Sequence, residues 1–131
     1  MKKTPLLNTA LSELIASLGH GDMVVIADAG LPIPAETYRI DLALTRGVPG
    51  FIETVRTVLS EMQVERVIIA NETTRVSPQV LQDLQALLPG VPFEQVSHDE
   101  LKDLCHRARA VVRTGEFTPY ANVILVAGVV F

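Results

Sequence analysis

The sequence predicts an α/β fold in which helices pack on both faces of a mostly parallel sheet of about six strands. One observation is a series of short apolar runs rich in β-branched residues, such as MVVIA at Met23–Ala27 and VERVIIA at Val64–Ala70. Another is that segments with apolar residues at helical spacing separate these runs. The length of 131 residues suits one domain, residues 1–131, around one core.

The first half of the chain predicts a helix followed by two strands. Apolar residues recur at helical spacing near the start, Asn8 or Thr9 can cap this helix, and Gly19 suits its end. Met23–Ala27 is apolar throughout between polar turn residues, so we expect a strand covered on both faces. Residues 38–44 alternate between apolar and polar side chains, which indicates a half-buried strand, and antiparallel pairing remains open for it.

The second half predicts three more helices and four more strands. Pro49 and Gly50 open one helix, Ser77 and Pro78 supply the N-cap and first turn of the next, and Ser97 with Glu100 forms a capping box for the last. The strands are expected at VERVIIA, VPFEQV, ARAVVR and NVILVAGVV. Their order in the sheet is left open.

The composition is apolar for a chain of this size. Hydrophobic residues make up 48% of the sequence, and the mean hydropathy is +0.32. The apolar segment VILVAGVVF is therefore expected to pack in the core or between subunits. Cys105, the single cysteine, has no partner for a disulfide or a metal site, and we expect it to be a small core residue.

Charge and patterning exclude several classes of protein. The net charge of −4 offers no basic stripe for phosphates, so we expect no nucleic-acid partner. No apolar run approaches the roughly 20 residues of a membrane span, and polar residues interrupt the first helix where a signal peptide would be apolar. We therefore expect a cytoplasmic protein without a membrane partner.

Two polar side chains flank the first predicted strand. Asp28 follows the strand, at the end where α/β folds bind ligands, in a loop stiffened by Pro32 and Pro34. A turn-capping role for Asp28 is an equal alternative. His20 precedes the strand between Gly19 and Gly21, and an exposed loop histidine is the simpler interpretation.

Other candidate groups lie later in the chain. His98 falls in the first turn of a capped helix, where the helix dipole favours an uncharged ring that both donates and accepts hydrogen bonds. His106 lies late in the same helix and is expected at the surface. Tyr120, Ala121 and Asn122 precede the last strand and offer a phenol, backbone groups and an amide, although a simple proline-led turn competes with this interpretation.

Familiar signatures of metal, nucleotide and serine-hydrolase sites are absent from the sequence. It contains no glycine-rich phosphate loop, HExxH, paired CxxC or G-x-S-x-G. The remaining His, Asp, Tyr and Asn side chains suit hydrogen bonding to a polyhydroxy ligand and proton transfer.

Several longer stretches together resemble the D-ribose pyranase family, in the group of sugar-ring interconverting proteins that includes fucose mutarotase. These stretches are LNTALSELIASLGHGD, DAGLPIP, RIDLALTRGVPGF, EMQVERVIIANE, SHDELK and TGEFTPYANVILVAGVVF. They cover most of the chain, and DAGLPIP resembles the ribose branch in particular. Residues 73–95 match the family only in helical character and a following strand, which leaves substrate preference most open there.

The resemblance implies specific roles for the candidate residues. His20 would be the catalytic acid, and the sugar-binding groups would be Asp28, His98, Tyr120, Ala121 and Asn122. It also implies a cytoplasmic enzyme that uses no cofactor and no metal and forms a homo-oligomer built of rings, usually a decamer.

The implied reaction interconverts the pyranose and furanose rings of D-ribose by general acid/base ring opening and closure, supplying ribose for catabolism. One alternative is a mutarotase that exchanges the anomers of ribose or fucose through the same proton transfers. The other is a non-catalytic sugar-binding protein. A strand of five residues spans about 17 Å, so His20 and Asp28 need not meet within one subunit unless the chain folds back. Whether a neighbouring subunit completes the site is left open, and this distance is a reason to consider it.

Overall fold

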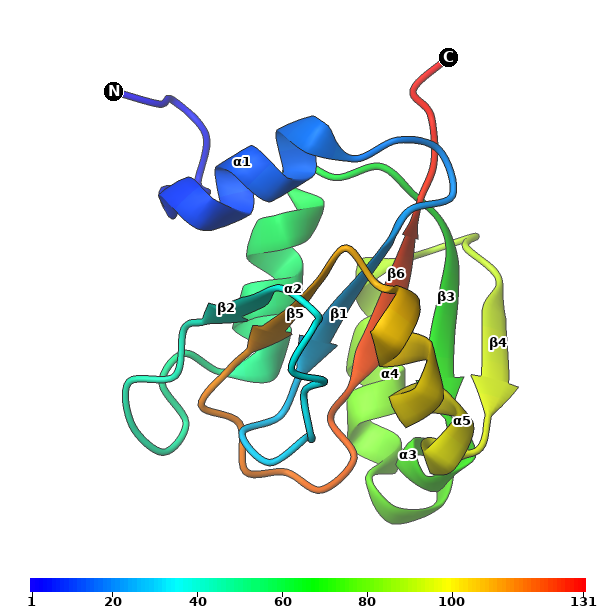
Figure 1. Ribbon diagram of the computed structural model, residues 1–131. Coiled ribbons are helices and arrows are strands. Elements are labelled where there is room, and N and C mark those ends of the chain that lie inside the picture. The colour runs from blue at the N-terminus through cyan, green and yellow to red at the C-terminus, as the bar shows by residue number, and fades with distance from the viewer.

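The computed structural model describes residues 1–131, which form one six-stranded sheet (Figure 1). The strand order is β2-β5-β1-β6-β3-β4. Strand β6 is antiparallel to its neighbours β1 and β3, and the other pairs are parallel. The predicted mostly parallel sheet is confirmed. The strands are β1 (Met23–Ala27), β2 (Arg39–Asp41), β3 (Val64–Ala70), β4 (Phe93–Val96), β5 (Ala110–Arg113) and β6 (Val123–Ala127).

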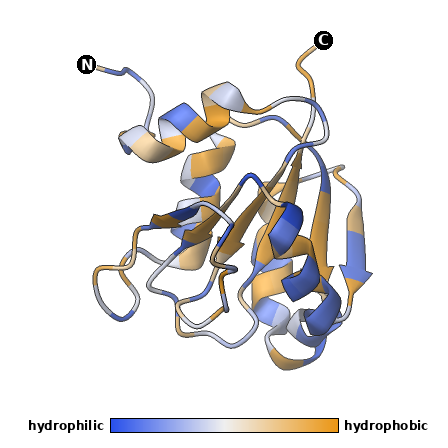
Figure 2. Ribbon diagram, viewed as in Figure 1, coloured by the Kyte–Doolittle hydropathy of each residue, from blue (hydrophilic) through white to orange (hydrophobic).

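Helices cover both faces of the sheet, as the sequence predicts. The larger core lies between the sheet and α1, α2 and α4, and it includes Leu14, Phe51 and Leu84. The smaller core lies on the other face and includes Leu101 of α5 and Cys105. Figure 2 shows the apolar central strands behind the largely polar α5. The helices are α1 (Thr9–Ser17), α2 (Phe51–Leu59), α3 (Asn71–Val76), α4 (Pro78–Leu87), α5 (His98–Leu104) and the 3-10 helix η1 (Cys105–Arg107).

All three predicted N-cap residues occupy the N-cap position, but the side chain of only two of them makes the capping hydrogen bond. The side chain of Asn8 accepts a hydrogen bond from the N–H of Leu11 at 3.0 Å. The hydroxyl of Ser97 accepts one from the N–H of Glu100 at 3.1 Å. The hydroxyl of Ser77 instead donates to the carbonyl of Pro119 at 2.6 Å. Ser77 therefore ties the start of α4 to the turn that precedes β6.

The strand predicted at residues 38–44 is shorter than expected. Only Arg39–Asp41 forms a strand, and it pairs parallel with β5, so the antiparallel alternative is wrong. Asp41 accepts a hydrogen bond from the N–H of Ala43 at 3.0 Å, which turns the chain away from the sheet. Tyr38 and Leu44 are consequently exposed.

The structure adds helix α3, which the sequence pattern did not predict, and it divides the apolar segment at the end of the chain. Val123–Ala127 is buried as β6, whereas Val130 and Phe131 are exposed in the single chain. None of the helices is both long and apolar enough to cross a bilayer.

Cys105 is buried in the smaller core, as predicted. Its thiol is fully shielded from solvent and lies 3.4 Å from the carbonyl oxygen of Leu101. Burial raises the pKa of the Cys105 thiol to about 11. The thiol stays protonated at neutral pH, which suits a core residue and not a nucleophile.

Replacing Gly115 with alanine is expected to destabilise the fold. A Cβ atom there would lie 2.5 Å from the carbonyl oxygen and 2.7 Å from the nitrogen of Val48, and it would also strike the carbonyl of Thr45. Backbone atoms cannot move aside cheaply, so we expect a loss of about 1–3 kcal/mol in the free energy of unfolding, measured by urea denaturation. Gly19→Ala is the control, because its Cβ meets only Asp22 Oδ2 at 3.7 Å. Equal stability of the two variants would contradict this prediction.

Candidate active site

One edge of the sheet gathers most of the predicted site residues. Parallel strands β1, β3, β4 and β5 end at this edge, and β6 begins there because it runs the opposite way. Asp28 follows β1, His98 follows β4 by one residue, and Asn122 immediately precedes β6. Inversion of β6 is therefore what brings the residues before the last strand to the carboxyl ends of the others.

Asp28 and Asn122 form a reciprocal pair. The side-chain oxygen of Asn122 accepts from the backbone N–H of Asp28 at 2.9 Å, and its amide donates to Asp28 Oδ2 at 3.0 Å. Asp28 Oδ1 accepts from the N–H of Gly30 at 2.9 Å. Because Asn122 is only 1% exposed, the pair is anchored in the core and the carboxylate has one orientation.

His98 and Tyr120 lie beside this pair. Their rings meet edge to face, with centroids 5.0 Å apart at 84°. The N–H of His98 donates to Glu72 Oε2 at 2.9 Å, which ties the start of α5 to the start of α3, directly after β3. Tyr120 has a φ of 60°, an uncommon conformation for a bulky residue. The hydroxyl of Thr73 holds this turn by donating to the carbonyl of Tyr120 at 2.8 Å.

A hollow of about 280 Å³ opens between these groups, and Ala121 does not line it. Ala121 is fully buried in the larger core, so its side chain fills space behind the site. Polar atoms of Asp28, His98 and Tyr120 line the hollow together with residues of the loop that follows β1. The lining residues are Asp28, Gly30, Leu31, Pro32, His98, Pro119 and Tyr120.

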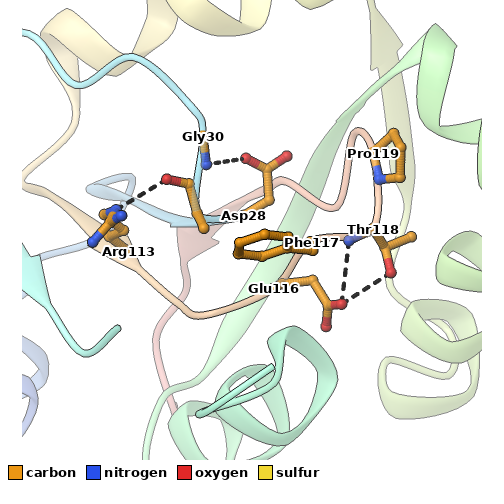
Figure 3. A pocket seen from close by; sticks show the side chains of 8 residues that line it. Asp28, Gly30, Arg113, Glu116, Phe117, Thr118 and Pro119 are labelled. Carbon is orange, nitrogen blue, oxygen red and sulfur yellow. Dashed lines mark hydrogen bonds between the residues drawn. The ribbon is translucent and has the colours of Figure 1, made fainter. Parts of the chain in front are cut away.

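A second hollow of about 390 Å³ shares Asp28, Gly30 and Pro119 with the first (Figure 3). Arg113 Nε donates to the carbonyl of Ala29 at 3.0 Å, and Figure 3 shows this bond beside the one from Gly30 to Asp28. The loop after β1 is thus held from both sides, which fixes the carboxylate that the two hollows share.

Glu116 lies in the second hollow and holds two segments together. Its Oε1 accepts from the N–H of Phe51 at the start of α2, and its Oε2 accepts from the hydroxyl of Thr118 at 2.9 Å. Burial raises the pKa of Glu116, but hydrogen bonds from the N–H of Phe51 and from Thr118 outweigh it and lower the pKa overall. Glu116 is therefore a structural carboxylate at this edge.

Replacing Glu116 with glutamine is expected to lower stability at neutral pH. A depressed pKa means that the ionised carboxylate stabilises the fold above the ordinary pKa of a glutamate, and this contribution disappears as the pH falls through the folded-state pKa. Water screens this partly buried group, so we expect about 1 kcal/mol or less at pH 7. Urea denaturation of both proteins at neutral and acidic pH measures it. A difference that stays constant down to low pH would contradict the assignment.

His20 lies at the opposite edge of the sheet, as the sequence predicts. It occupies the turn between α1 and β1, where the N–H of Gly21 donates to the carbonyl of Ala127 at 2.8 Å. Its side chain is 61% exposed, and Nε2 lies 2.7 Å from Glu65 Oε2. Asp28 follows the other end of the same strand. One chain therefore does not bring His20 to Asp28, His98 and Asn122.

A family model describes almost the whole chain. The model of the RbsD / FucU transport protein family matches residues 1–130. The chain belongs to this family. The resemblance predicted from the sequence motifs is thereby confirmed.

Individual members of the RbsD / FucU family match this chain over full length. A D-ribose pyranase from Chloroflexus aggregans is 72% identical over 131 residues, covering 100% of both chains. One from Symbiobacterium thermophilum is 58% identical with the same coverage. The structure of Bacillus subtilis RbsD complexed with D-ribose has a TM-score of 0.96 at 48% identity, covering 100% of both chains. A fucose mutarotase from Streptococcus pneumoniae shares the fold, with a TM-score of 0.82 at 23% identity over the full length of both chains.

Sequence reasoning missed two acidic residues of this RbsD / FucU family member. Glu72 orients the start of α5, and Glu65 contacts His20. Glu72 had a signal, because it follows a buried strand just as Asp28 does. No sequence signal marked Glu65 as functional, because a polar residue inside a strand ordinarily faces solvent. His106 is exposed and pairs with Glu36 at 2.5 Å, as expected of a surface histidine.

Proposed function

We propose that residues 1–131 act as one domain that interconverts the pyranose and furanose rings of D-ribose. The observation that carries the proposal is the fixed Asp28 carboxylate, which lines one hollow with His98 and Tyr120. The close relatives named D-ribose pyranase and the similar RbsD complexed with D-ribose support this substrate.

The groups around the hollow match a polyhydroxy ligand. Asp28 offers acceptor oxygens to sugar hydroxyls, and its two bonds to the protein keep those oxygens in place. The rings of His98 and Tyr120 supply polar edges together with apolar faces. Asn122 acts behind Asp28 by holding it. These roles are our proposal for the sugar-binding residues.

Ring opening requires two proton transfers. We assign to His20 the role of the acid that donates a proton to the ring oxygen. The bond between the ring oxygen and the anomeric carbon breaks as this proton arrives, and its electron pair stays on the oxygen. The anomeric hydroxyl loses its proton to a base, and its O–H electrons complete the carbonyl of the open chain. Closure by a different hydroxyl reverses both transfers and gives the other ring size. The overall reaction is redox-neutral.

The site in this proposal is shared between subunits. His20 lies at one edge of the sheet and the sugar-binding residues at the other, so a neighbouring copy would have to supply His20 to the hollow. Exposed apolar side chains, including Leu7, Leu44, Phe117 and Phe131, are available for such contacts. We propose a cytoplasmic homo-oligomer built of rings, a decamer, whose mass analytical ultracentrifugation would measure.

Mixing two variants that are each impaired in a different half of the site, at a ribose concentration too low to saturate Asp28→Asn, tests whether the site is shared. Oligomers reassembled from equal amounts of His20→Ala and Asp28→Asn chains are expected to recover about one quarter of wild-type activity. At random mixing, about one site in four combines the intact His20 of one chain with the intact Asp28 of its neighbour. Each variant reassembled alone is the control. Failure of the mixture to exceed the two controls would place the complete site within one chain.

NMR magnetisation exchange between the pyranose and furanose signals of D-ribose tests the reaction itself. Accelerated exchange between ring sizes is the expected result. Acceleration between anomers of one ring size alone would favour the mutarotase, for which the shared fold with a fucose mutarotase is the supporting observation. Saturable ribose binding without acceleration would favour a sugar-binding protein.

A further inference from the structure

Strand β3 contains a bulge at Glu65. Val64 pairs with Ala127 and Arg66 pairs with Val126, so Glu65 is one extra residue opposite β6. Glu65 and Arg66 are both exposed, which breaks the alternation of a regular strand. A bulge of this kind redirects a side chain without ending the strand. Here the redirected side chain is the carboxylate that contacts His20.

The contact between Glu65 and His20 is built from fixed backbone on both sides. The His20 turn is attached to β6 by two bonds of 2.8 Å, Gly21 N–H to the carbonyl of Ala127 and Ala127 N–H to the carbonyl of Asp22. A Cβ atom on Gly128 would lie only 3.0 Å from Glu65 Cβ, so the backbone just after β6 also packs closely on Glu65. The backbone at the end of β6 therefore supports both residues of the contact, in which His20 Nε2 lies 2.7 Å from Glu65 Oε2.

The chemistry of this contact determines which nitrogen carries a proton. An ionised carboxylate only accepts hydrogen bonds, so Nε2 of His20 must carry the hydrogen that Glu65 receives. Nδ1 is then the nitrogen left to exchange a proton with a ligand. Pairs of this type orient histidines in many catalytic and metal sites.

We propose that Glu65 is a positioning residue, which holds the His20 ring so that Nδ1 delivers the proton. This inference rests on the proposed function, in which His20 is the acid. The His20 Nδ1–H bond breaks as the ring oxygen of the sugar takes its proton, and the neutral ring that remains keeps its hydrogen on Nε2, bonded to Glu65. Closure returns the proton from the attacking hydroxyl to Nδ1.

A purely structural role explains the pair less well. The two side chains are 61% and 41% exposed, and ion pairs this exposed contribute little to stability. The Glu94 to Arg66 pair gives a matched comparison, because it joins neighbouring strands at 2.6 Å with side chains 49% and 44% exposed and includes no histidine.

Glu65→Ala and Glu94→Ala, measured side by side with the wild type, test the inference. We expect Glu65→Ala to lower kcat for ring exchange about 10- to 100-fold, the range found when a histidine loses its orienting partner. KM should stay within about twofold, because in this proposal Glu65 acts on the His20 ring and not on the sugar. Glu94→Ala should retain wild-type kcat, and the Tm of both variants should be close to that of the wild type.

The nitrogen spectrum of His20 supplies a readout that does not depend on activity. In protein labelled with 15N-histidine, at a pH high enough for neutral rings, we expect the His20 hydrogen on Nε2 in the wild type and distributed over both nitrogens in Glu65→Ala. The signals of the other two histidines are separated by recording His20→Ala.

The outcomes separate this inference from the proposed function. Absence of catalysis by the wild type, or full activity of His20→Ala, would overturn the proposed acid and Glu65's role with it. Loss of activity in His20→Ala, with either unchanged kcat or an unchanged tautomer in Glu65→Ala, would overturn the role of Glu65 alone.

Discussion

His20→Ala is expected to abolish catalysed exchange between the ring forms of ribose while leaving the fold intact. Loss of a general acid typically lowers a rate by about 10²- to 10⁴-fold. The side chain is exposed and fills no core space, so the Tm should not fall. Magnetisation exchange at saturating ribose measures the rate, and calorimetry measures binding, which the groups at the opposite edge should largely retain.

His106→Ala is the matched control for this variant. His106 is also exposed, and it also pairs with a glutamate, Glu36. It lies on η1, away from both hollows around Asp28. Full exchange activity in His20→Ala, or an equal loss in His106→Ala, would contradict the assignment of the acid.

Asp28→Asn is expected to weaken ribose binding about 10- to 100-fold, because hydrogen bonds to a charged group are each worth about 1.5–3 kcal/mol. The two oxygens of Asp28 accept from two different donors, Gly30 N–H and the Asn122 amide. An asparagine keeps only one acceptor, so in either orientation its own NH₂ group would face a donor. The carboxylate would lose both its charge and its fixed orientation. Titration calorimetry measures the affinity.

Asp83→Asn makes the same chemical change away from the site. Asp83 lies on α4 and accepts a hydrogen bond from Gln79 at 2.9 Å. Its replacement should leave both affinity and the ribose-dependent rise in Tm unchanged. Wild-type affinity in Asp28→Asn would show that the carboxylate does not bind the sugar.

The fold was predictable where a segment's environment is uniform. Buried strands such as Met23–Ala27 and Val64–Ala70 were assigned with their correct ends, because each contains a continuous run of apolar, mostly β-branched residues that is buried on both faces. Residues 38–44 misled because alternation fits any half-exposed extended segment, and the Asp41 turn that ends β2 depends on a local side-chain bond. The side chain of Ser77 misled because a tertiary partner, the carbonyl of Pro119, replaced the local capping bond.

The site was predictable in composition but not in arrangement. Asp28 and Asn122 were named from their places beside strands and His98 from its place in the first turn of a helix, and the structure brings all three to one edge. Strand order cannot be read from one sequence, so neither the Asp28 to Asn122 pair nor the inversion of β6 was foreseeable. Glu65 was hidden for a related reason, since a bulge is a property of two paired strands.

The central place of β6 also determines how the molecule can be assembled during synthesis. Strands β2, β5 and β1 form one half-sheet and β3 with β4 form the other, and β6 alone joins them. It follows these strands in the chain, so both half-sheets must wait, with their inner edges unpaired, until the ribosome has released residues 123–127. Exposed strand edges are where nascent chains associate wrongly. The sheet is therefore completed only when β6 inserts between two half-sheets that earlier segments of the chain form.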